Sequence, residues 1–299
     1  MRRSFLILAV VVAAVTASSA QTDLDAFMSQ VLNRRDDNWK KLQQYVLDED
    51  ETFVLTGPDA QRLYGSHREY TWFPRDGVFI RSPVKADGVS ISEDERRKAE
   101  ERWLGEEHAR EKRRLERENK DANDNDAPPS LDDLVRPGNE PRFVSTAYFM
   151  RFKFEPGHYA LVGRERLLDR DVLKIEYYPA QLFSEGRTRP NRRVRERDER
   201  VQEKMNKVAL ITLWIEPTAH QILQYEFRNI DFDFLPGRYL VRLDDLRATM
   251  RMGQAFPDVW LPETIGMRFA MTLAIGTIDG RYDVRYHDYR EATVRTRVR

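Results

Sequence analysis

Six segments in the C-terminal third of the chain carry apolar side chains at every second position, and this alternation constrains the fold most. The segments are residues 209–215, 223–227, 239–243, 246–252, 265–275 and 282–286. Successive side chains of a β-strand point to opposite faces, so each segment has one dry and one wet face. No stretch between the segments is long enough for the helix of a parallel crossover. The pattern predicts a mainly β (α+β) fold built on one large, curved antiparallel sheet.

Turn-forming residues separate these segments and set the expected strand ends. They are Glu216-Pro217, Asn229, Leu235-Pro236-Gly237, Asp244-Asp245, Phe256-Pro257 and Asp279-Gly280. Upstream, helical spacing predicts an opening helix over Leu24–Tyr45, and residues 45–55 look extended. A hairpin is expected over Arg68–Val84 around an Asp-Gly turn, and Phe143–Phe154 reads as a strand.

The composition excludes several classes of protein. The chain of 299 residues has 50 basic and 50 acidic side chains, so bulk charge does not predict nucleic-acid binding. A long uncharged apolar run occurs only at the N-terminus, which argues against a polytopic helical membrane protein. Cysteine is absent, which removes disulfides, thiolate metal ligands, cysteine nucleophiles and the acylated cysteine of a bacterial lipoprotein.

The N-terminal residues 1–20 have the pattern of a secretory signal peptide. Arg2 and Arg3 precede an uncharged run that ends in small residues at Ala20. The apolar core Phe5–Val15 is shorter than the roughly twenty residues that span a bilayer, which disfavours an uncleaved anchor. We expect cleavage after Ala20 and a periplasmic protein. The paired arginines also resemble a twin-arginine signal, so general secretory and twin-arginine export both remain open.

The mature residues 21–299 are expected to form one β-rich domain with two charged inserts. The first insert, residues 92–141, starts with a capping-box pattern at Ser92–Glu95 and continues as a charged helix followed by a polar, disordered segment. Its few large apolar residues predict a solvated helix, although binding of a partner protein is an alternative. The second insert, residues 184–207, reads as a charged hairpin extension or short helix.

Catalytic patterns are scarce. The chain lacks a Gly-x-Ser-x-Gly elbow, a phosphate-binding loop and a His-Glu-x-x-His zinc helix. We therefore expect no enzyme, no metal site and no cofactor. Basic residues of the second insert and the tail arginines Arg295, Arg297 and Arg299 suggest a weak contact with an anionic membrane surface.

Methionines gather on the dry face of two adjacent predicted strands, where they can line an acyl chain or simply pack the core. The candidate cavity residues on this and neighbouring strands are Leu213, Tyr225, Phe227, Tyr239, Val241, Leu243, Met250, Met252, Trp260, Met267, Phe269 and Met271.

Several short motifs in the C-terminal half resemble the lipoprotein-carrier (LolA/LolB-like) outer-membrane lipoprotein-sorting domains. They are Leu213-Trp214-Ile215-Glu216-Pro217, Ile222-Leu223-Gln224-Tyr225-Glu226-Phe227, Val259-Trp260-Leu261-Pro262 and Tyr286-His287-Asp288-Tyr289-Arg290. The resemblance covers mainly residues 143–294 and implies an incomplete antiparallel barrel whose concave side holds acyl chains beneath helices. It implies a lipid or an acylated protein as partner. The alternatives are a cell-envelope scaffold with a filled core and, less favoured, an enzyme.

Overall fold

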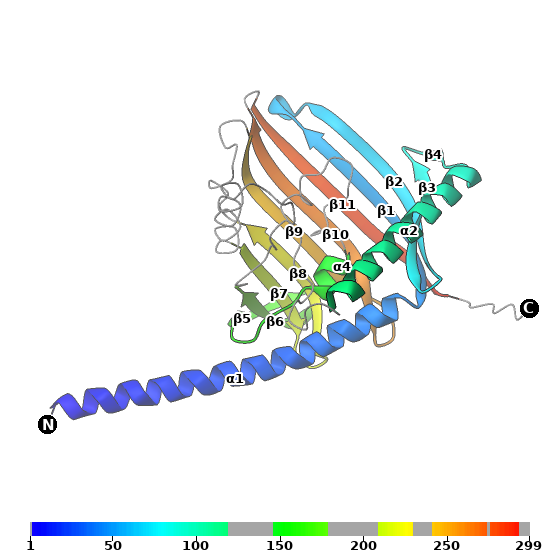
Figure 1. Ribbon diagram of the computed structural model, residues 1–299. Helices are drawn as coiled ribbons and strands as arrows, with labels where there is room; N and C mark the ends of the chain where they lie inside the picture. Colours follow the sequence, from blue (N-terminus) through cyan, green and yellow to red (C-terminus); the bar gives the residue numbers. More distant parts are fainter. Residues whose placement is uncertain (1, 119–145, 179–208, 230–240, 274–275, 293–299) are drawn as a thin grey trace, which may run out of the picture.

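The computed structural model describes residues 2–118, 146–178, 209–229, 241–273 and 276–292. Within these ranges the side chains of 2–20, 110–111, 113–118, 147–148, 209, 229, 241–245 and 273 lie outside the description. Their eleven strands form one antiparallel sheet in the order β4-β3-β2-β1-β11-β10-β9-β8-β7-β6-β5. The predicted antiparallel, mainly β architecture is therefore confirmed. The sheet does not close into a barrel, because β4 and β5 form its two edges (Figure 1).

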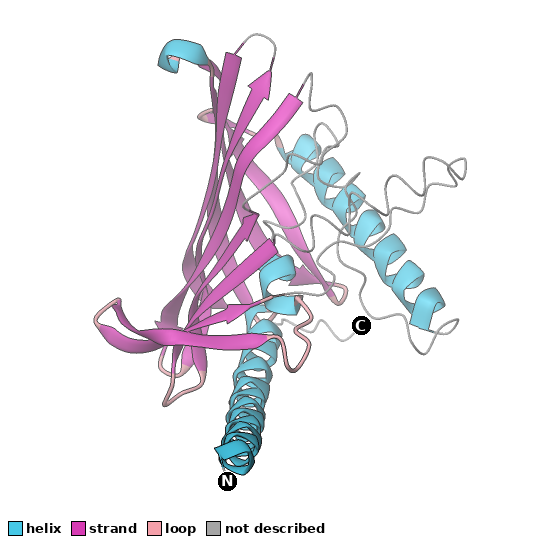
Figure 2. Ribbon diagram, turned by 90° about the vertical axis from the view of Figure 1, so that its left-hand side faces the viewer, coloured by secondary structure: helices cyan, strands magenta, loops and turns pink. Residues whose placement is uncertain are grey.

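The strands are longest in the middle of the sheet. Their bounds are β1 Tyr45–Thr56, β2 Arg62–Arg75, β3 Val78–Ala86, β4 Val89–Ser90, β5 Tyr159–Leu167, β6 Arg170–Tyr177, β7 Ala209–Glu216, β8 Gln221–Asn229, β9 Val241–Phe256, β10 Val259–Leu273 and β11 Gly276–Glu291. The helices are α1 Arg2–Leu42, α2 Glu93–Glu118, α4 Thr146–Arg151 and the short 3₁₀ helix η1 Pro58–Ala60. Helices α1, α2 and α4 all lie on one side of the sheet (Figure 2).

Helix α1 has two parts with different surroundings. Its C-terminal part packs against the sheet, where Met28 and Val31 are fully buried, whereas its N-terminal part extends past the sheet edge (Figure 1). Among the residues whose side chains are described, no helix is long and apolar enough to cross a membrane.

Three local expectations from the sequence are wrong. Asp244-Asp245 is no turn but lies inside β9, beside a register irregularity opposite Ala270 and Met271. Asp279-Gly280 lies inside β11, and the segment expected as a strand over Phe143–Phe154 contains α4. The two Asp-containing pairs failed as turn signals because long paired strands tolerate a bulge or a glycine where the neighbouring strand accommodates it.

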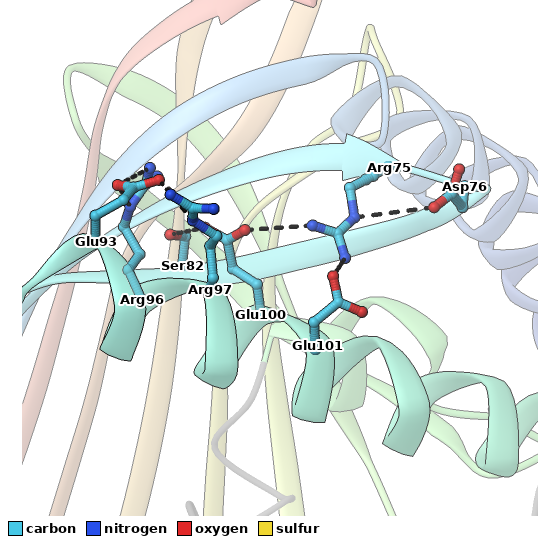
Figure 3. A network of polar contacts seen from close by, with 8 residues as sticks. All are labelled: Arg75, Asp76, Ser82, Glu93, Arg96, Arg97, Glu100 and Glu101. Atoms are coloured by element: carbon cyan, nitrogen blue, oxygen red, sulfur yellow. Dashed lines mark hydrogen bonds and ion pairs between the residues drawn. The ribbon is translucent and has the colours of Figure 1, made fainter.

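Helix α2 begins with the predicted capping box, since the Ser92 hydroxyl accepts the amide of Glu95 at 3.4 Å while the Glu95 carboxylate accepts the amide of Ser92 at 3.2 Å. The helix is not fully solvated, contrary to the prediction. Glu100 is buried and accepts the Ser82 hydroxyl at 2.5 Å, and Arg75 donates to both Glu100 and Glu101, at 3.3 and 2.7 Å (Figure 3).

This packing covers a sheet edge. Strand β3 pairs with β4 only at Lys85 and Ala86, so within the described residues its earlier part has no strand partner on that side. Trp103 of α2 donates its indole N–H to the carbonyl oxygen of Phe79 at 3.0 Å, and its ring meets Trp72 edge to face. Because an uncovered edge invites pairing with other chains, α2 protects the sheet.

We expect Trp103→Ala to lower the free energy of unfolding by about 1–3 kcal/mol, because the half-buried ring and its hydrogen bond to the β3 edge are lost. Arg102→Ala, at an exposed neighbouring position, should stay within about 0.5 kcal/mol. Urea unfolding followed by circular dichroism measures both. Equal stability of the two variants would contradict this role and would indicate that α2 is a solvated insert.

Adjacent residues of β10 should respond in opposite ways to a new negative charge. Met267 is buried on the helix-facing side and Arg268 is exposed on the other. Met267→Asp buries an unpaired carboxylate and should cost more than about 3 kcal/mol, whereas Arg268→Asp should be tolerated. Thermal unfolding of both variants is the measurement, and the reverse order of stability would contradict the register.

Candidate functional site

The strand register brings most of the predicted cavity residues onto one apolar face. Leu213 of β7 lies opposite Tyr225 of β8, which lies opposite Met250 of β9. The next row runs from Phe227 through Ala248 to Met267 of β10. All these side chains are buried, so segments more than fifty residues apart share one apolar face, which we call the inner face of the sheet.

Helix α1 closes one end of the inner face and is fixed there by polar contacts. The guanidinium group of Arg35 donates to the carbonyl oxygen of Phe152 at 2.5 Å and lies over the Phe154 ring, 5.6 Å from its centroid. Asn38 is almost fully buried and donates to the side-chain oxygen of Gln221 at 2.8 Å. These contacts hold the apolar side of α1 against β8 and the neighbouring strands.

An aromatic cluster that the sequence did not predict fills this end. Phe149 of α4 and Phe152 and Phe154 after it pack against Tyr225 and Tyr177, and burial raises the pKa of Tyr177 to about 12. The gap left among these rings is about 10 Å³, too small for an acyl chain. The alternation of Phe152 and Phe154 was the available signal, but it suggested a strand.

The opposite end of the inner face is more open. Phe269 and Met271 of β10 are half-buried, and Phe53 of β1 is half-buried on the same face. The tip of the Phe269 ring lies against Gly280, where a Cβ atom would collide with it. Glycine is therefore needed in the middle of β11, which explains why Asp279-Gly280 resembled a turn.

The remaining candidates lie elsewhere on this face or outside the described part. Met252 and Trp260 are buried near the β9–β10 turn, and the guanidinium group of Arg170 lies 5.0 Å from the centroid of the Trp260 ring. Tyr239 falls outside the described residues. For Val241 and Leu243 only the backbone is described, within β9.

A buried ionic cluster borders the apolar residues on the same face. Arg81 of β3 contacts the carboxylates of Glu49 and Glu51, which are buried at inward positions of β1. The guanidinium carbon lies 3.7 Å from the centroid of the Tyr70 ring, and the Tyr282 hydroxyl donates to Glu51 at 2.9 Å. The signal for this cluster was that Glu49 and Glu51 take up the same every-second-position series of β1 as the apolar Leu47 and Phe53.

Arg81→Leu should lower the free energy of unfolding by about 3–5 kcal/mol, because Glu49 and Glu51 lose the buried guanidinium group that they share. Glu51 keeps the more exposed guanidinium group of Arg68, 3.9 Å away. Combining it with Glu49→Gln and Glu51→Gln should recover part of that loss, since no buried charge then lacks a partner. Chemical denaturation of the three proteins is the measurement. A triple variant less stable than Arg81→Leu alone would contradict this electrostatic account.

Among the described residues, no group of three or more His, Asp and Glu side chains is placed to hold a metal ion. The inner face offers apolar surface, aromatic rings and one ionic cluster.

No family model matches the chain, and no curated protein matches it in sequence. Solved structures do show similarity. A domain described as an outer membrane lipoprotein-sorting protein domain from Vibrio parahaemolyticus has 11% identity and a TM-score of 0.33, covering 90% of this chain and 93% of its own. A DUF1329 family protein from Desulfovibrio piger has 10% identity and a TM-score of 0.37, covering 92% and 93%.

Lipovitellin, whose structure concerns lipid–protein interactions, has 6% identity and a TM-score of 0.32, with 85% of this chain and 26% of lipovitellin covered. The first of these three structures carries the class name that the sequence resemblance indicated. Since all three TM-scores are low, the function proposed below rests on the residues of this chain.

Proposed function

We propose that the protein is an exported binding protein that holds an acyl chain or another apolar ligand on the inner face of its open sheet. The main support for this proposal is that the continuous apolar inner face is fully buried at one end and partly exposed at the other. Met250 and Met267 are 0% and 4% exposed, whereas Phe269 and Met271, further along the same face, are half-buried. A ligand would occupy the accessible end.

The chemistry of this end suits a flexible hydrocarbon. Each methylene removed from water contributes about 0.8 kcal/mol, and methionine adapts to irregular apolar shapes. Ile278 lies opposite Met271 on β11 and extends the apolar surface by one strand. Glu51, which belongs to the ionic cluster with Glu49 and Arg81, lies two residues before Phe53 in β1. The polar head of an amphiphile would therefore have charged groups beside the apolar surface.

The proposed setting is the periplasm, reached through cleavage of the signal peptide after Ala20. The position of the first residues of α1 beyond the sheet edge is compatible with their removal from a folded domain of residues 21–299. Binding requires no metal, cofactor or covalent chemistry.

A cell-envelope scaffold with a filled core is the second candidate, and the gap of about 10 Å³ beneath α4 favours it. In that case the inner face serves only as a core, and charged α2 is the surface for a partner protein.

Long-chain fatty acid added below its critical micelle concentration should raise the melting midpoint of the protein. A ligand in hundredfold excess over its Kd stabilises the folded state by about 2.7 kcal/mol. Met271→Asp should reduce the shift, because a carboxylate at the accessible end would be desolvated beside the hydrocarbon and would repel the fatty-acid headgroup. Val89→Asp is the matched control, since Val89 is 69% exposed on the distant edge strand β4.

The expected result is a full shift in wild type and Val89→Asp and a reduced shift in a folded Met271→Asp. If fatty acids of several chain lengths leave the melting midpoint unchanged, the proposal is contradicted and the filled-core scaffold is favoured.

A further inference from the structure

Four arginines lie side by side on the outer face of the sheet, the face opposite the helices. Arg228 of β8 is directly opposite Arg247 of β9, Arg247 is opposite Arg268 of β10, and Arg268 is opposite Arg281 of β11. Neighbouring strands are about 4.7–4.9 Å apart, so this arginine row places four positive charges in one short line.

The row opposes folding, because like charges directly across from each other destabilise a strand pair. Nearby carboxylates compensate it only in part. Arg228 and Arg247 share Glu226, at 4.0 and 3.7 Å, and Arg281 pairs with Asp283. Among the described side chains, none of the carboxylates lies within ion-pair distance of Arg268, which is exposed. Within that part of the structure, the centre of the row has no paired carboxylate.

A depression of about 500 Å³ adjoins this centre. Arg247, Arg268 and Arg285 line it together with the hydroxyl-bearing Thr249 and Thr264. Its size is within the range of small-molecule sites. Gly266 forms part of the lining, and a Cβ atom there would lie 3.3 Å from the Thr249 hydroxyl oxygen. The absence of a side chain at Gly266 keeps the depression deep.

Asp50, Asp283 and His67 also line the depression, and the two carboxylates have cationic partners. Arg285 donates to Asp50 at 2.7 Å, His287 lies 3.3 Å from the same carboxylate, and Arg281 pairs with Asp283. The guanidinium groups of Arg247 and Arg268 therefore dominate the side of the depression nearest the arginine row.

We propose that this depression binds a small, soluble anion with more than one phosphoryl group. Planar guanidinium groups form paired hydrogen bonds with phosphate oxygens, and adjacent strands repeat them at a spacing that two phosphoryl groups can bridge. The Thr264 hydroxyl supplies an additional donor, whereas the Thr249 hydroxyl donates to the carbonyl oxygen of Gly266 at 3.4 Å. This anion site lies on the face opposite the proposed apolar site and is independent of it.

Isothermal titration of the full chain with sodium pyrophosphate at low ionic strength tests the site. Arg268→Gln should weaken binding about tenfold or more, because it removes a charged donor. Its melting midpoint without pyrophosphate should be unchanged or higher, since the like-charge repulsion is relieved. Arg164→Gln is the control, because Arg164 is exposed on the distant edge strand β5. Gly266→Val should also weaken binding, without any change of charge.

Three results would overturn the proposal. The first is the absence of pyrophosphate binding by the wild-type protein. The second is equal affinity in Arg268→Gln and Arg164→Gln. The third is binding to phosphatidylglycerol vesicles without binding to pyrophosphate, which would make the arginine row a membrane-contacting surface rather than a small-anion site.

Discussion

The pairing of β1 with β11 is the interaction on which the rest of the structure depends. It joins the first described strand to the last described strand over almost the whole length of β1, from Tyr45 to Thr56. Without it the meander β1–β4 and the meander β5–β11 would be separate small sheets with exposed edges. The same pairing brings Glu51 next to the Tyr282 hydroxyl and Phe53 opposite the Tyr282 backbone, so it also forms the boundary between ionic cluster and apolar face.

Different helices cover different parts of the inner face, and one part is only partly covered. Helix α1 and the rings around α4 seal the end near β7 and β8, where Met28 and Phe149 are buried. The first turns of α2 instead cover the β3 edge near Trp72. Phe269 and Met271, at the opposite end of the inner face, remain half-buried. Partial cover of a continuous apolar face is the physical basis for distinguishing a binding surface from a core.

Much of the fold could be predicted, because alternation is a local property of the chain. Met250, Met252 and Met267 are buried as the pattern indicated. Contacts that depend on register between strands could not be predicted, since register comes from tertiary pairing. The Phe269 ring against Gly280 and the ion pairs of Arg81 are of this kind. The six-residue helix α4 was missed because it is too short to show a helical period.

Strand alternation also lets neighbouring residues serve different surfaces. Met267 belongs to the inner face and Arg268 to the arginine row, although a single peptide bond joins them. The burial of Met267 stabilises the sheet, whereas Arg268 repels its neighbours across the strands. The apolar face therefore supplies the free energy that keeps the arginines aligned. A row of like charges can persist on such a sheet only because the opposite face is well packed, so the outer face depends on the inner one for its shape.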